Sequence, residues 1–177
     1  MASTYSKDLE VYNAEQFIKS FSDTKIYFTF GYQSPWQNEL SPDQANTSVQ
    51  SYYETWRYMI GGKLVTGNDV RHVIPRFNWT ANTTYIAYDQ NQDSLTKGAN
   101  TAYYVMTDDY NIYKCIANNN GQPSTSKPTS TTPGLIIQTA DQYYWKYMYT
   151  LTDDEKLRFT SSNFIPVKTI KTNDSSL

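Results

Sequence analysis

The sequence of 177 residues has few of the side chains that most catalytic and metal sites require. It contains one cysteine, Cys115, and one histidine, His72. A single cysteine excludes a disulfide framework and a cysteine-rich zinc site, and a single histidine excludes a histidine-clustered metal centre. We therefore expect no cofactor, no metal, and a fold that is stabilised by an ordinary hydrophobic core.

Charge is also scarce, because Asp, Glu, Lys and Arg make up 18% of the residues and the formal net charge is −2. A near-neutral chain does not bind nucleic acid by bulk charge. No apolar run approaches the roughly 20 residues that a membrane-spanning helix needs. We expect neither nucleic acid nor a membrane among the partners.

The remaining candidate catalytic groups have ordinary structural explanations. His72 lies among apolar strand-forming residues, where a lone histidine is usually structural, and Cys115 lies in an apolar strand pattern. The acidic pair Asp108–Asp109 lies before Tyr110 in a turn between strands, where Asp is common. The acidic run 153–155 lies in the first turn of a helix pattern, where acids complement the helix dipole. We expect a protein that is not an enzyme and has no small-molecule substrate.

Aromatic and small polar residues take the place of charge. The chain has 17 Tyr, 7 Phe and 4 Trp, and Asn, Gln, Ser and Thr make up about a third of it. Tyr and Thr favour strands, and Tyr also suits wet protein–protein interfaces because it combines a large apolar area with a polar tip. Composition therefore allows two roles for the tyrosines, filling a thin core or covering interfaces.

Hydrophobic spacing predicts the elements. Helices are expected at 13–22, with Asn13 as N-cap, at 48–60, ended by Gly61 and Gly62, and at 153–159, with Thr152 as N-cap. Strands are expected at 25–30, 63–66, 70–74, 84–88, 102–106, 111–117, 135–137, 143–151 and 164–167. The predicted fold is mainly β with a few short helices, an antiparallel β-sandwich-like single domain over residues 1–177, in which Trp145 faces the core.

Residues 118–133 form a long polar segment rich in Asn, Ser, Thr and Pro. Such a segment gains little hydrophobic free energy on burial, so we expect it to lie outside the core. Its length exceeds what a strand connection needs, which favours a role in assembly, with a plain surface spacer as the alternative.

Several short motifs occur in an order that is similar to one protein family. The motifs are FTFGYQSPW at 28–36, WRYM at 56–59 with GGKLV at 61–65, VIPRFNW at 73–79, YKC at 113–115, TADQYYWKYMY at 139–149 and FIPV at 164–167. The ordered set, over residues 15–168, resembles the baseplate wedge protein of T4-like contractile-tailed phages, the gene-product-eight family. The motif residues that we select as structural are Gly31, Pro35, Trp36, Trp56, Pro75, Arg76, Trp79 and Trp145.

The resemblance implies a structural component of the virion, made in the host cytoplasm and built into the tail baseplate. It implies a homodimer within each wedge, which contacts other wedge subunits during tail assembly. Family chains are longer, so the sequence corresponds to an N-terminal portion of a longer protein or to a shortened member. The family pattern has a glycine where this chain has Gln142, so the turn before the 143–151 strand is expected to differ.

The alternative function is a carbohydrate- or receptor-binding module of a virion. Such a module would leave Trp36, Trp79 or Trp145 exposed beside Asp or Asn in a cleft, so that the indole could stack on a sugar ring. In a structural subunit the same side chains would be buried or covered by another subunit. Exposure of these three side chains therefore separates the two functions.

Overall fold

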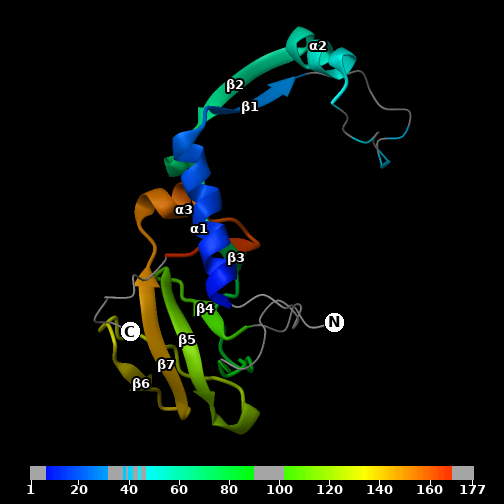
Figure 1. Ribbon diagram of the computed structural model, residues 1–177. Coiled ribbons are helices and arrows are strands. Elements are labelled where there is room, and N and C mark those ends of the chain that lie inside the picture. Colours follow the sequence, from blue (N-terminus) through cyan, green and yellow to red (C-terminus); the bar gives the residue numbers. More distant parts are fainter. Residues whose placement is uncertain are drawn as a thin grey trace, which may run out of the picture. The chain divides into compact units, whose positions relative to one another are not determined.

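The computed structural model describes residues 7–31, 47–89 and 102–168, together with positions 38, 40, 41 and 44. The chain divides into two compact units, Met1–Arg71 and His72–Leu177, and each unit is described by itself. Three antiparallel sheets and three helices make up the described residues (Figure 1), which confirms the mainly β, sandwich-like fold class. The single domain over 1–177 stays a prediction.

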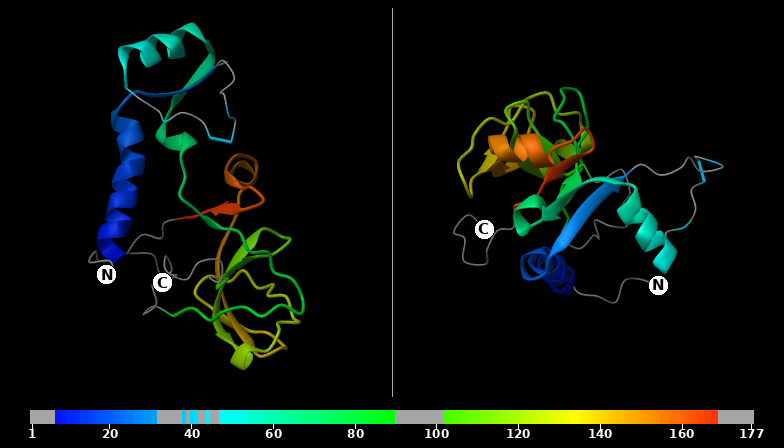
Figure 2. Two further views of the ribbon diagram at one scale, coloured as in Figure 1. Left: turned by 90° about the vertical axis from the view of Figure 1, so that its right-hand side faces the viewer. Right: turned by 90° about the horizontal axis from the view of Figure 1, so that it is seen from above.

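The first unit consists of helices and one β-ribbon. Its elements are α1 (Lys7–Asp23), β1 (Ile26–Gly31), α2 (Val49–Arg57), β2 (Met59–Val65) and a 3₁₀ turn, Gly67–Asp69. Strands β1 and β2 pair with each other in antiparallel register, from Ile26 opposite Val65 to Phe30 opposite Gly61. Figure 2 shows the two strands as one curved ribbon that carries α2.

Two sequence-based boundaries in this unit are wrong. Helix α1 begins at Lys7, so Asn13 lies inside the helix rather than at its N-cap. Helix α2 ends at Arg57, and Met59–Gly62 belong to β2 instead of ending a helix. Pairing with β1 explains the second error, because a Cβ atom on Gly61 would lie 3.0 Å from the ring of Phe30. The glycine makes room for that ring, and the backbone is satisfied by the partner strand.

The second unit is built on a four-stranded sheet. Strands β4 (Tyr104–Met106), β5 (Asn111–Asn118), β7 (Tyr143–Thr150) and β6 (Ile136–Gln138) follow in that spatial order, and every neighbouring pair is antiparallel. A separate ribbon pairs β3 (Val73–Pro75) with β8 (Phe164–Pro166), and α3 (Asp153–Phe159) precedes β8. The strand predicted at 84–88 is not formed; only Thr83 makes an isolated bridge, to Ser124.

Both faces of this sheet carry hydrophobic packing. One cluster comprises Tyr85, Val105, Tyr113, Cys115, Tyr143 and Trp145. The other comprises Met106, Ile112, Leu151 and Ile165. Val105 and Met106 are neighbours in β4, as are Ile112 and Tyr113 in β5, and neighbouring strand residues point to opposite faces. The two clusters therefore lie on opposite faces, one under the segment around Tyr85 and the other under the β3–β8 ribbon.

The prediction that Trp145 faces the core is confirmed, since its side chain is fully buried. The prediction that the polar segment 118–133 lies outside the core is wrong for two of its residues. Ser124 and Pro128 are both buried, although neither belongs to a helix or strand of the sheet. Hydrogen bonds from Ser124, Thr125 and Ser126 to the Asp141 carboxylate hold this segment against the fold.

Candidate functional site

The first unit exposes a large set of apolar side chains, which we call the unit 1 apolar surface. On the β1–β2 ribbon it comprises Tyr27, Phe28, Phe30, Ile60 and Leu64, and on α2 it comprises Val49, Tyr52, Tyr53 and Trp56. Tyr27 and Phe28 are 62% and 64% exposed and are neighbours in one strand. Neighbouring strand residues point to opposite sides, so the ribbon is aromatic on both faces.

Helix α2 contributes an aromatic stripe to this surface. Its N-cap is Ser48, whose hydroxyl accepts a hydrogen bond from the Ser51 N–H at 3.2 Å. From there, Val49, Tyr52, Tyr53 and Trp56 follow at the i, i+3, i+4, i+7 spacing that places side chains on one side of a helix. The ring of Tyr52 contacts those of Tyr53 and Trp56 edge to face, with centroids 6.3 and 6.1 Å apart. The motif residue Trp56 is nevertheless 58% exposed.

The motif residue Gly31 ends strand β1 next to an irregularity in the pairing. The register shifts between Phe30 and Gly31, and Gly31 lies opposite Met59. A Cβ atom at this position would overlap the carbonyl group of Tyr58, so only glycine fits the close approach of the two chains. The motif residues Pro35 and Trp36 lie outside the described residues.

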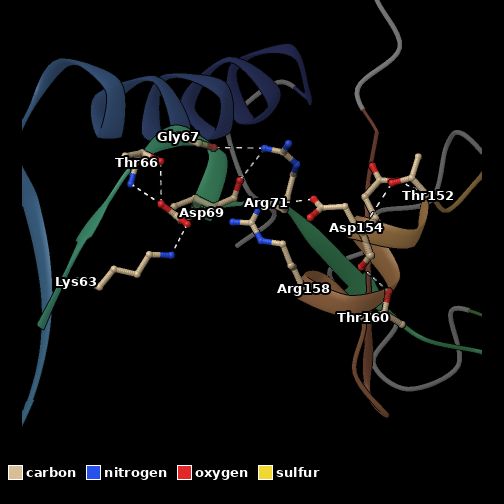
Figure 3. A network of polar contacts seen from close by, with 11 residues as sticks. Lys63, Thr66, Gly67, Asp69, Arg71, Thr152, Asp154, Arg158 and Thr160 are labelled. Carbon is tan, nitrogen blue, oxygen red and sulfur yellow. Dashed lines mark hydrogen bonds and ion pairs between the residues drawn. The ribbon is translucent and has the colours of Figure 1, made fainter. Parts of the chain in front are cut away.

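A polar network fixes the turn that follows β2 (Figure 3). The Lys63 ammonium contacts the Asp69 carboxylate at 2.5 Å, and the N–H and hydroxyl of Thr66 donate to the same carboxylate at 2.9 and 2.8 Å. These bonds, that of Lys63 first, hold the pKa of Asp69 well below its usual range. A nearby pocket of about 300 Å³ between the end of α1 and β2 contains Lys25 as its one charged lining residue, so it offers no acid–base pair.

Two motifs that are far apart in the sequence pair with each other in the second unit. Strand β3 contains Pro75 and strand β8 contains Pro166, and the register places Ile74 opposite Ile165. The motif residue Arg76 extends this contact, because its N–H donates to the Asn163 carbonyl and its guanidinium donates to the Ser161 carbonyl, both at 2.8 Å. Pro75 and Arg76 therefore hold the ribbon together rather than line a cleft.

The two described motif tryptophans of the second unit are packing residues. Trp145 stacks on Tyr143 and meets Tyr85 edge to face, with ring centroids 5.5 and 5.6 Å apart. Trp79 packs against the same cluster, and its indole N–H donates to the Ser124 hydroxyl at 3.2 Å. Neither indole forms an exposed platform.

A single carboxylate, Asp141, fastens the polar segment to the turn before β7. One of its oxygens accepts hydrogen bonds from the Ser124 hydroxyl and from the N–H groups of Thr125 and Ser126, at 2.7, 2.7 and 2.9 Å. The other accepts from the Thr139 hydroxyl. Partial burial acts to raise the pKa of Asp141, but these hydrogen bonds outweigh it and lower the pKa to about 2. We call this arrangement the Asp141 clip.

Asp141 was not predicted from the sequence to be a structural residue. The available signal was local: Thr139 and Asp141 lie in the turn before β7, a position where short polar side chains commonly bind nearby backbone. The partners in 124–126 lie about fifteen positions away, so spacing alone could not have shown them. Gln142 adopts φ of 62°, a left-handed conformation that glycine favours.

Three candidate catalytic side chains of the second unit, Cys115, Asp108 and Asp109, are buried or held in an ion-pair contact. Burial raises the pKa of the Cys115 thiol to about 12, so the reactive thiolate is disfavoured. Asp108 and Asp109 lie in the turn between β4 and β5, where both contact the Lys127 ammonium, at 2.6 and 3.1 Å. His72 directly precedes β3, and its carbonyl accepts from the Val167 N–H.

The acidic run at the start of α3 caps that helix, as the sequence predicted. Thr152 and Glu155 form a reciprocal capping box, and the Thr152 hydroxyl accepts from the Glu155 N–H. Asp153 pairs with Lys156 at 3.0 Å, and Asp154 pairs with Arg158 at 3.5 Å, the latter pair visible in Figure 3. In the part of the chain that the structure describes, no three His, Cys, Asp or Glu side chains gather as a metal site would require.

Two comparisons with known proteins found no relative of this chain. No family model matches the sequence. A search of curated proteins gave no match either. Across the described ranges, no helix combines the length and the apolar content needed to cross a bilayer. The unit 1 apolar surface is therefore the strongest candidate for a functional site.

Proposed function

We propose that the protein is a structural subunit of a contractile phage tail baseplate, a wedge component that binds other wedge subunits and a second copy of itself. The ordered motifs across residues 15–168 support the baseplate assignment, because they resemble those of the wedge family. The unit 1 apolar surface supports the assembly role. Such a subunit acts in the virion and needs interface area rather than reactive groups.

The observation that carries the proposal is that the first unit has no buried side chain of its own among its described residues. Among the described residues, every fully buried hydrophobic side chain lies in the second unit, from Tyr85 onward. Fully burying one large apolar side chain contributes about 1.5–3 kcal/mol of favourable free energy. A partner that covered the nine exposed side chains of the unit 1 apolar surface would therefore gain a large binding free energy. Aromatic side chains are also those that interface cores favour and that dominate binding energy.

The alternative of a carbohydrate- or receptor-binding module has less support. It requires exposed indoles at Trp36, Trp79 or Trp145. Trp145 is fully buried, and Trp79 packs on the core with its N–H bonded to Ser124. Trp36 lies outside the described residues. The packing of Trp79 and Trp145 supports the proposal of a structural subunit.

The test is made in the phage that encodes this chain. A double variant, Tyr52→Ala with Trp56→Ala, should abolish tail assembly and leave the chain outside the tail fraction of sedimented particles. The matched control is Leu157→Ala, because Leu157 is 86% exposed on α3 of the second unit. The control should assemble at wild-type yield. If the double variant enters tails as the wild type does, or if wild-type particles lack the chain, the proposal is wrong.

A further inference from the structure

The four-stranded sheet carries two lysines side by side on one face. The pairing register places Tyr104 opposite Lys114 and Lys114 opposite Lys146. It also places Lys146 opposite Ile136, so the row crosses all four strands. Directly opposed residues in antiparallel strands lie on the same side of the sheet, with Cα atoms about 4.5–5.5 Å apart. The two ammonium groups therefore extend from adjacent positions on one face.

These two lysines differ from the other described lysines of the second unit. Lys127, Lys156 and Lys168 each contact a carboxylate, at 2.6, 3.0 and 3.3 Å respectively. Within the described ranges, Lys114 and Lys146 contact none. Like charges directly opposite each other destabilise a sheet. Among the described residues, no carboxylate contact offsets this destabilisation.

The surroundings of the pair are partly apolar and partly open. The Lys114 ammonium lies 4.0 Å from the ring centroid of Tyr88. Burial lowers the pKa of Lys114, and the neighbouring charge of Lys146 lowers it further. Ile136 is 51% exposed and Tyr144 is 38% exposed beside the pair. An incoming carboxylate would neutralise the repulsion, and apolar side chains next to it would find contact area.

We propose that Lys114 and Lys146 form a docking site for an acidic segment of a partner polypeptide, with one or two carboxylates held by the ammonium pair. We choose an acidic partner because complementary charge across an interface determines which partner binds. A nucleic acid would need a larger basic surface, since its binding sums over several phosphate contacts, and the chain as a whole is acidic. A sugar would need a free aromatic face, and the Lys114 ammonium covers the Tyr88 ring.

This site is independent of the proposed assembly role of the first unit. It lies on a different unit and depends on charge rather than on apolar area. The two proposals therefore fail separately: substitutions of Tyr52 and Trp56 test the first, and substitutions of Lys114 and Lys146 test the second.

The experiment measures binding of a short fluorescein-labelled oligoglutamate to the full chain by fluorescence anisotropy at low salt. The double variant Lys114→Gln with Lys146→Gln should bind the probe about tenfold or more weakly than the wild type, because the opposite charges are removed. The control is Lys127→Gln with Lys156→Gln, which removes the same charge from the same unit but should bind within about twofold of wild type.

A second readout separates docking from a structural role of the lysines. Because the pair is repulsive in the free chain, Lys146→Gln alone should raise the melting temperature, whereas a structural lysine would lower it. Added oligoglutamate should raise the wild-type melting temperature and leave that of the double variant unchanged.

Several results would overturn the proposal. If the control variant at Lys127 and Lys156 lost as much binding as the variant at Lys114 and Lys146, probe binding would depend only on the net charge of the chain. Tighter binding of heparin fragments or single-stranded DNA than of oligoglutamate would assign the site to another class of partner. If Asp93→Asn strengthened oligoglutamate binding, the occupant would be the chain's own 90–101 segment. If the wild type self-associated and the double variant did not, the occupant would be a second copy.

Discussion

Strands β1 and β7 are both rich in aromatic residues, yet the two units of the chain use these residues differently. In β7 of the second unit, Tyr143 and Trp145 are fully buried. In β1 of the first unit, Phe28 and Phe30 are 64% and 58% exposed. Strand composition alone therefore does not decide whether a side chain becomes core.

The difference follows from what surrounds each strand. Strand β7 is paired on both sides, by β5 and β6, and its cluster is covered by Tyr85 and Trp79. Strand β1 has one neighbour, β2, and a two-stranded ribbon is marginally stable by itself in water. The second unit should therefore fold on its own contacts, and the first should gain order from a partner. The predictions below test this contrast, from the largest expected effect to the smallest.

The contrast is sharpest for two tryptophans. Trp145→Ala should lower the free energy of unfolding of the isolated chain by about 3–5 kcal/mol, because it empties a filled core position. Trp56→Ala should change the same quantity by less than about 0.5 kcal/mol, because that side chain is exposed. Urea denaturation followed by circular dichroism measures both. Equal melting of the Trp145 variant and the wild type would contradict the core assignment of β7.

The Asp141 clip should make the stability of the second unit dependent on acid. Its carboxylate has a folded pKa of about 2, below the ordinary value of 3.8, so the folded state binds fewer protons. The clip therefore stabilises the fold above about pH 4 and loses this contribution as the pH falls toward 2. Allowing for solvent screening, we expect the Asp141 carboxylate to contribute about 1–2 kcal/mol to the free energy of unfolding at neutral pH.

The measurement compares urea unfolding of the wild type and Asp141→Asn at neutral and acidic pH. The variant should be less stable at neutral pH, and the two stabilities should converge as the pH falls to 2 and below, because the wild-type carboxyl becomes protonated over that range. Asp153→Asn is the control, since that side chain is 99% exposed and its bond to Lys156 is a surface contact. A difference that stayed constant down to low pH would argue against a carboxylate clip.

The residues in these two predictions also show which features of the fold could be predicted from the sequence. Local patterns predicted the strand 143–151 with Trp145 inward, the strand at 111–117 and the capped helix at 153–159, because alternation and capping residues act within a few positions. The burial of Ser124 was not predictable, because it depends on a bond to Asp141 from another part of the chain. The pairing of β3 with β8 is equally non-local.

The candidate sites could likewise be predicted from the sequence only in part. The stripe Val49–Trp56 was visible in the sequence as an amphipathic helix, but its exposure depends on which other elements pack against it, and no local pattern records that. The Lys114–Lys146 pair depends on the strand register. A shift of one residue would move one lysine to the opposite face, and the register is set by bulges in β5 and β7. Sequence reasoning therefore identified the elements but not their neighbours.

Substitutions of helix N-caps test the difference between the two units, with a smaller expected effect. Thr152 caps α3 in the second unit, and Ser48 caps α2 in the first. Thr152→Ala should lower the free energy of unfolding by about 1 kcal/mol, the usual cost of a lost N-cap. Ser48→Ala removes similar chemistry, but it should leave the main unfolding transition of the isolated chain in place, because α2 belongs to the first unit, whose described residues include no buried side chain. A loss of equal size for both would show that the units unfold together.

The smallest expected effect concerns Gln142 in the turn before β7. Its φ of 62° is costly for a residue with a side chain, by roughly 1–2 kcal/mol. Gln142→Gly removes this strain, but it also removes the hydrogen bond from the Gln138 amide at 2.7 Å and adds unfolded-state entropy. The net effect should be a gain of stability of less than about 1 kcal/mol. Gln138→Ala is the control, because it deletes the same hydrogen bond without changing the backbone, and it should lower stability slightly. If Gln142→Gly is no more stable than Gln138→Ala in thermal unfolding, then backbone strain at this turn is negligible and the turn adds nothing to the stability difference between the units.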